Sequence, residues 1–222
     1  MADLPVSSPG AALRLPFRNS VSNDGCGNKQ TRIRHFTDMS TKLFLPLFLT
    51  ALAVATAAEP AHPPARGSKA ADFSLKSSRG EEVRLSSLLA KSPVVLIVLR
   101  GYPGYQCPFC NRQVQDLVRS EVEFARAGLK VVVVYPGPAQ DLGQRANELL
   151  QDKSFPTSYE MLLDPDYKFT NLYGLRWDGP KETAYPSTFV IDKSGVIRFE
   201  KVSGQHGDRT TSAEILDAAK KL

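Results

Sequence analysis

The chain has 222 residues, with 28 Lys and Arg, 23 Asp and Glu, and a formal net charge of +5. This length allows one domain with a sizeable core. The positive excess is small, six basic and three acidic residues fall within residues 1–58, and the sequence has neither a basic helix face nor a glycine-rich phosphate loop. We therefore expect no nucleic-acid partner.

The first 38 residues are unlike a folded domain, because they show no sustained hydrophobic period and are rich in Ser, Asn, Pro, Gly and Arg. We interpret residues 1–38 as a disordered extension, or as a non-native one that results from a misassigned start codon, with Met39 as the true start. Cys26 lies in this extension, so we expect it to have no part in the chemistry.

Residues 39–58 have the pattern of a secretory signal peptide. Lys42 supplies a positive charge, Leu43–Ala55 is apolar, and small residues follow. A membrane-spanning helix needs about 20 apolar residues, so this run is too short to be one. We expect an exported protein, periplasmic or otherwise extracytoplasmic, with no stable membrane insertion. It would be membrane-anchored only if the signal is not cleaved.

Residues 59–69 are rich in proline and predict a linker, and the domain follows over residues 70–222. Its strands and helices are separated by short turn signals. We predict strands over 72–75, 83–85, 94–99, 131–135, 161–163, 188–191 and 196–202. We predict helices over 86–89, 108–125, 139–153, 167–173 and 211–222, the last opened by a capping box that starts at Thr211.

Two cysteines stand where a buried strand gives way to a helix. Val94–Leu99 is an unbroken apolar run, and the turn after it ends at Cys107-Pro-Phe-Cys110. Pro108 fits the first turn of a helix, where its missing N–H costs nothing. Both cysteines therefore lie at a helix N-terminus, where free N–H groups and the helix dipole favour a thiolate over a thiol.

A thiolate is the attacking species in disulfide exchange, and a second cysteine one helical turn later can close a ring and release a mixed disulfide. We expect Cys107 to be exposed at the helix cap. Cys110 shares the apolar stripe of the helix, so we expect it to be shielded. The alternatives for the pair are half of a zinc site and an inert structural disulfide. We expect neither a metal nor a cofactor.

The order of the predicted elements and the segments LRGYPGYQCPFC and YPSTFVIDKSGVIRFE resemble the redoxin branch of the thioredoxin-like superfamily. This branch holds peroxiredoxins of the alkyl-hydroperoxide-reductase/thiol-specific-antioxidant type and extracytoplasmic thioredoxin-like reductases. The resemblance implies an α/β thioredoxin-like fold, with a central mixed β-sheet flanked by helices and an N-terminal β-hairpin extension. It also implies a thiol-based oxidoreductase.

The first functional hypothesis is an exported thiol-disulfide oxidoreductase with Cys107 as nucleophile and Cys110 as resolving thiol. The resemblance implies a cis-proline at Pro186, with the backbone of Tyr185 free to pair with an incoming disulfide substrate. The substrate would be a protein or small-molecule disulfide, and an unidentified thiol would donate the electrons.

The second hypothesis is a thiol peroxidase. Peroxiredoxins carry Pro-x-x-x-Thr/Ser-x-x-Cys, and Pro103, Cys107 and Cys110 fit this spacing, which makes Cys110 the peroxide-reacting thiol. Peroxiredoxins carry an arginine at the position that Pro186 holds in this sequence, so that arginine is missing here. Arg100, at the end of the buried strand, could replace it in binding the substrate.

Two further residues, His206 and Arg209, are candidates that the sequence does not place. A minor third hypothesis is a Cu(I) chaperone, because two cysteines and a distant histidine bind Cu(I) in some thioredoxin-like proteins. The cysteines stand one residue closer than in those chaperones, and residues 174–185 contain no histidine.

Overall fold

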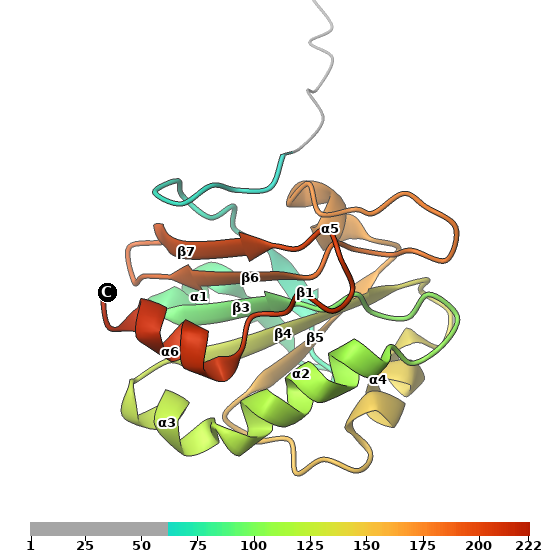
Figure 1. Cartoon of the computed structure of the whole chain (residues 1–222), viewed down its shortest axis with the longest axis horizontal. Helices are drawn as coiled ribbons and strands as arrows, with labels where there is room; N and C mark the ends of the chain where they lie inside the picture. Colours follow the sequence, from blue (N-terminus) through green and yellow to red (C-terminus); the bar gives the residue numbers. More distant parts are fainter. Residues whose placement is uncertain (1–61) are drawn as a thin grey trace, which may run out of the picture. The chain divides into compact units, whose positions relative to one another are not determined.

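The apolar run after Pro93 forms the central strand of a five-stranded sheet (Figure 1). The computed structural model describes residues 62–222. The strands of the sheet are β3 (Val94–Val98), β4 (Lys130–Gly137), β5 (Glu160–Pro165), β6 (Ser187–Ile191) and β7 (Ile197–Val202). Their order is β5-β4-β3-β6-β7, with β4 parallel to β3 and β5, and β6 antiparallel to β3 and β7. This is the mixed α/β sheet that the sequence predicts.

Helices cover both faces of the sheet (Figure 1). They are α1 (Leu85–Leu89), α2 (Pro108–Arg119), α3 (Glu121–Arg126), α4 (Leu142–Leu150), α5 (Lys168–Leu172) and α6 (Ser212–Ala219). A small hairpin of β1 (Ser74–Lys76) and β2 (Glu82–Arg84) precedes them in a two-stranded sheet of its own. The hairpin is the predicted N-terminal extension.

The two faces bury different side chains, since alternate residues of a strand point to opposite faces. Val95 and Ile97 of β3 join a core with residues of α2, α3, α4 and α6. Leu96 and Val98 join a second core with residues of α1, α5 and the hairpin. Each buried Val or Leu side chain contributes about 1.5–3 kcal/mol. Strand β3 is thus a firm base for the segment that follows it.

A close backbone contact fixes the turn between β3 and α2. Gly101 has φ +78°, and a β-carbon built on it would lie 1.9 Å from the carbonyl oxygen of Pro136. The next residue, Tyr102, donates its N–H to the same oxygen at 3.0 Å. Only glycine tolerates both the left-handed conformation and this approach. The cysteine segment therefore leaves the sheet along a defined path.

Two local predictions differ from the structure. The helix predicted over 108–125 breaks at Ser120, whose φ of −98° and ψ of 18° let the chain restart as α3. The restart turns Phe124 into the core, where it packs edge to face against Tyr159 with ring centroids 6.3 Å apart. The predicted linker 59–69 also ends earlier than expected, because Gly67 and Ser68 form backbone hydrogen bonds with Ile197 of β7.

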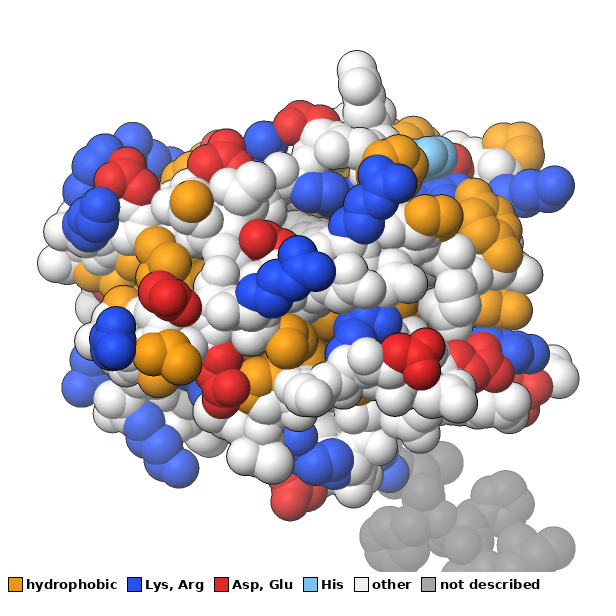
Figure 2. Space-filling view, turned by 60° about the horizontal axis from the view of Figure 1, so that its bottom comes forward, with side chains coloured by type: hydrophobic (Ala, Val, Ile, Leu, Met, Phe, Trp, Pro, Cys, Tyr) orange, Lys and Arg blue, Asp and Glu red, His pale blue; other side chains and the backbone are white. Residues whose placement is uncertain are grey.

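The capping box at the start of α6 is confirmed, with Thr211 and Glu214 each accepting the other's backbone N–H. The predictions for residues 1–38 and 39–58 lie outside the described residues. Within residues 62–222, none of the helices has the length and apolar character that crossing a bilayer requires. Figure 2 shows basic and acidic side chains interspersed over one face of the molecule.

Candidate active site

The two thiols lie together in the first turn of α2. Cys107 is the N-cap residue with an extended backbone, Pro108 is the first helical residue, and Cys110 follows in the same turn. Both are free cysteines, so the structure represents the reduced dithiol. Cys110 is fully buried, as predicted from the apolar stripe.

The expected exposure of Cys107 is wrong, because only 1% of its surface is accessible. The segment between β7 and α6 lies beside the start of α2, where Gly207 is against the Phe109 ring and Arg209 reaches both sulfurs. Gln113 donates from its side-chain amide to Thr210 O at 3.4 Å, and the N–H of Ser212 donates to the Asp116 carboxylate at 2.7 Å. A helix cap is exposed only while no other segment crosses it.

This covering segment brings Arg209 to the sulfurs. Its Nη2 lies 3.9 Å from Cys107 Sγ and 3.8 Å from Cys110 Sγ. Its Nε donates to the carbonyl oxygen of His206 at 2.7 Å, and its Nη1 donates to Gln113 Oε1 at 3.2 Å. Among residues 62–222, no carboxylate forms an ion pair with Arg209. The positive charge of Arg209 is therefore directed at the dithiol.

The environment separates the acidities of the two thiols. A hydrogen bond from the Cys110 thiol, the backbone N–H groups of Cys110 and Phe109, and the charge of Arg209 together lower the pKa of Cys107 to about 5, although its burial acts in the opposite direction. Burial and the neighbouring Cys107 raise the pKa of Cys110 well above its ordinary value. The surroundings of the pair thus favour a thiolate on Cys107 over one on Cys110.

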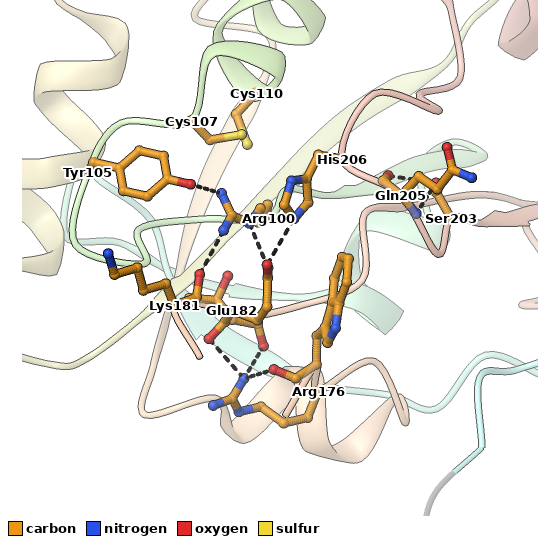
Figure 3. Close-up of polar contacts among 12 residues, drawn as sticks. Arg100, Tyr105, Cys107, Cys110, Arg176, Lys181, Glu182, Ser203, Gln205 and His206 are labelled. Atoms are coloured by element: carbon orange, nitrogen blue, oxygen red, sulfur yellow. Dashed lines mark hydrogen bonds and ion pairs between the residues drawn. The ribbon is translucent and has the colours of Figure 1, made fainter. Parts of the chain in front are cut away.

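Arg100 lies near the dithiol but is engaged elsewhere (Figure 3). Its side chain is only 2% exposed, and its Nε donates to Glu182 Oε2 at 2.8 Å. Its two remaining nitrogens donate to Tyr105 Oη and Lys181 O, each at 2.7 Å. Its charge is paired with the carboxylate of Glu182. Substrate binding by Arg100 stays a prediction, and Arg209 takes the place beside the sulfurs that Arg100 was expected to fill.

Tyr185 and Pro186 stand directly before β6, but their backbone groups are already paired. The N–H of Tyr185 donates to Leu175 O at 2.9 Å, and its carbonyl accepts from Ser187 Oγ at 2.8 Å. The carbonyl of Pro186 accepts the N–H of Ser203 at 2.9 Å. A peptide substrate would have to displace these bonds. Substrate binding at Tyr185 and Pro186, and the cis bond between them, stay predictions.

No sequence pattern points to Glu182, and none places His206 or Arg209 relative to the cysteines. Glu182 Oε1 lies 3.0 Å from His206 Nε2, and the His206 ring lies against Trp177 with centroids 5.1 Å apart. These partners come from two loops that are separated from the cysteines by 70 to 100 positions. A single sequence carries no signal for such contacts.

A shallow cleft of about 280 Å³ opens beside the dithiol. Its lining includes Phe109, Arg112, Gln113, Arg209 and Thr210. Arg209 both lines this cleft and lies beside the sulfurs, whereas neither cysteine lines the cleft. Among residues 62–222, the structure has no cluster of three or more His, Cys, Asp or Glu side chains that could hold a metal ion.

A thioredoxin-like sheet with a thiolate and a second thiol at one helix N-terminus defines a thiol-based oxidoreductase. Comparison with known proteins identifies the family within this class, because the model of the family described as AhpC/TSA matches residues 66–200. The chain belongs to the AhpC/TSA family.

Several relatives in that family are similar to this chain. Peroxiredoxin Bcp of Bacillus subtilis is 29% identical over 135 residues, which are 58% of this chain and 79% of the relative. A bcp protein of Helicobacter pylori is 34% identical over 136 residues, or 59% of this chain and 83% of the relative. The crystal structure of peroxidoxin BcpB from Mycobacterium tuberculosis superimposes with a TM-score of 0.57 at 24% identity, over 71% of this chain and 97% of that one. This last likeness concerns the fold.

Proposed function

We propose that this protein is a thiol-dependent peroxidase that reduces a hydroperoxide with the electrons of the Cys107–Cys110 dithiol. One observation carries the proposal: the thiolate is buried, yet it is held beside an arginine that no carboxylate in the described residues neutralises. A small peroxide can reach such a sulfur more readily than a protein disulfide can. The similarity to proteins named peroxiredoxins supports the same conclusion.

The residues provide a balanced reaction. The Cys107 thiolate attacks one peroxide oxygen, the O–O bond breaks, and Cys107 becomes a sulfenic acid while the peroxide is reduced by two electrons. The leaving oxygen takes the proton of Cys110, and Arg209 stabilises the charge that develops on it. The new Cys110 thiolate then attacks the Cys107 sulfur, and hydroxide leaves as the disulfide forms.

This assignment exchanges the roles that the family motif implies. By its distance from Pro103, Cys110 stands in the place of the peroxide-reacting cysteine. In the structure, however, Cys110 is fully buried and its pKa is raised, whereas Cys107 has the lowered pKa. Since a thiolate is the nucleophile, the attack belongs to Cys107 and the closing of the disulfide to Cys110.

Disulfide exchange remains the second candidate function, because a low-pKa cysteine followed one turn later by a second thiol suits it. Two observations count against it as the main activity. Cys107 is almost fully buried, and the backbone of Tyr185 is hydrogen-bonded within the chain. The electron donor in either case is a thiol, and export through residues 39–58 stays part of the proposal. N-terminal sequencing of protein from the native host tests export.

Stopped-flow kinetics on the reduced protein test the proposal. Hydrogen peroxide should oxidise the dithiol at least tenfold faster than a model peptide disulfide does at equal concentration. With Cys110→Ser, a sulfenic acid should accumulate on Cys107 and react with dimedone, whereas Cys107→Ser should react far more slowly. Faster oxidation by the disulfide would reject the peroxidase. A sulfenic acid that forms rapidly on Cys110 in Cys107→Ser would instead keep the peroxidase and restore the roles implied by the motif.

A further inference from the structure

A single carboxylate joins the two segments that meet at the dithiol (Figure 3). Glu182 lies in the loop between α5 and β6, and its side chain is 14% exposed. One of its oxygens accepts from Arg100 and the other lies against His206. Arg100 is tied to the loop before Cys107, and His206 is tied to Arg209, so each of the two partners belongs to a segment that leads to a sulfur.

The first connection runs from Glu182 to the cysteine segment. Arg100 follows β3, and its Nε donates to Glu182 at 2.8 Å. Its Nη1 donates at 2.7 Å to the hydroxyl of Tyr105, which stands two residues before Cys107. Arg100 also lies over the Tyr105 ring, 5.3 Å from its centroid. The position of the loop before Cys107 is thus tied to the Glu182 carboxylate.

The second connection runs from Glu182 to the guanidinium at the sulfurs. His206 Nε2 lies 3.0 Å from Glu182 Oε1, and the His206 carbonyl accepts from Arg209 Nε at 2.7 Å. The His206 ring also lies against the Trp177 ring, at an interplanar angle of 48°. The imidazole is therefore held at its edge and on one face, and its own backbone carbonyl orients Arg209.

The loop that carries Glu182 is itself braced. Arg176 Nη1 donates to the carbonyl oxygens of Trp177 and Thr183, and to that of Glu182 at 3.3 Å. The same guanidinium lies over the ring of Tyr167, 4.1 Å from its centroid. Glu182 therefore projects from a rigid support, as a residue must if it is to position others.

We propose that Glu182 is a positioning residue that holds Arg209 against the two sulfurs through His206, and that fixes the cysteine loop through Arg100. The proposal concerns the placing of the arginine, and it holds or fails whatever oxidant the dithiol meets. It also explains why a buried arginine, a histidine and an acid from three separate segments converge behind the thiols.

The sign of one measurement separates this role from a purely electrostatic one. Glu182 carries a negative charge near the dithiol, so its removal alone would favour the Cys107 thiolate and lower the pKa of that group. If Glu182 acts by positioning Arg209, its removal lets the guanidinium move away, and the pKa of Cys107 rises. Loss of stability alone predicts neither direction.

The test is the pH dependence of Cys107 alkylation in reduced Glu182→Gln. We expect the midpoint to rise by about one unit, which is tenfold less thiolate at pH values below both midpoints. Glu160→Gln is a matched control, because Glu160 also bridges two basic residues, Arg79 and Lys130, with its side chain 12% exposed. It should cost similar stability and leave the midpoint unchanged.

A second variant, His206→Leu, removes the side-chain contact with Glu182 but keeps both the backbone carbonyl that accepts from Arg209 and the Glu182–Arg100 pair. It should raise the midpoint as well, because residue 206 is then no longer held in place by Glu182. In an Arg209→Met background, Glu182→Gln should add no further rise, since the two residues act in one chain of contacts. The proposal is overturned if Glu182→Gln lowers the midpoint, or if neither variant moves it. It is also overturned if the rise from Glu182→Gln is undiminished without Arg209. None of these results depends on peroxidase activity, which the stopped-flow comparison tests separately.

Discussion

Two arginines lie near the dithiol, and their surroundings give them different roles. Arg100 is 2% exposed and its charge is paired with Glu182, so it serves as a structural cation that holds loops together. Arg209 contacts both sulfurs, and in the described part of the chain it has no carboxylate partner. A charge that is already neutralised does little for a nearby thiolate, because the field of its partner cancels most of its own. The partner of an arginine, more than its distance from the site, decides its role.

The largest effect we expect is on stability, from Arg100→Met. The substitution leaves the Glu182 carboxylate in a poorly solvated place with only His206 beside it, and breaking a buried pair in this way costs about 3 kcal/mol of the free energy of unfolding. Urea denaturation measures this loss. The control is Arg198→Met, which breaks a pair whose arginine side chain is 48% exposed and should cost less than about 1 kcal/mol. Equal costs in the two variants would show that Arg100 is not the structural cation described here.

Arg209→Met should have the converse effect, with little loss of stability and a slower reaction. Without the guanidinium, the pKa of Cys107 rises and the leaving oxygen loses its positive neighbour, so oxidation by peroxide at pH 6 should slow about 10- to 100-fold. Stopped-flow kinetics measure the rate. Arg112→Met is a matched control, because Arg112 lines the same cleft but lies over the Phe109 ring, 5.7 Å from its centroid. If Arg112→Met slowed the reaction as much, the effect would belong to the charge of the cleft in general.

Much of this arrangement follows from local sequence patterns, and the rest does not. The apolar run Val94–Leu99, the CPFC segment and the Thr211 capping box predict the central strand, the thiols at the helix start and the final helix, because each pattern acts over a few residues. The burial of Cys107 depends on a segment about 100 positions later. Such a contact leaves no mark in the local pattern of α2.

The same limit applies to the arginines. Arg100 directly follows the buried strand that leads to the cysteines, so the sequence predicts that it lies at the site. Arg209 lies in a loop, and no hydrophobic periodicity predicts the course of that loop. Only the fold shows that Glu182 pairs with Arg100, whereas Arg209 lies beside the sulfurs. The position at which peroxiredoxins carry an arginine is Pro186 here, and the arginine beside the sulfurs, Arg209, lies in a different part of the chain.

The smallest effect, taken over a single pH unit, is a pH dependence of stability in the reduced protein. The folded pKa of Cys107 is depressed to about 5 from an ordinary thiol value. The unfolded state therefore binds more protons between those values, so stability rises with pH through this window, by at most about 1.4 kcal/mol per pH unit. The stability that the Cys107 thiolate contributes is lost as the pH falls toward 5. Urea denaturation from pH 5 to 8 should show this slope, and the slope should be smaller in Cys107→Ser and in Arg209→Met.

The most direct test of the account is the site of brief alkylation. Reduced protein is treated with limiting iodoacetamide at pH 6, and peptide mass spectrometry then measures how much of each cysteine has reacted. Because Arg209 and the start of α2 favour a thiolate on Cys107, we expect Cys107 to be modified at least tenfold faster than Cys110, and this preference to shrink in Arg209→Met. Preferential modification of Cys110, or a preference for Cys107 that Arg209→Met leaves unchanged, would contradict the account.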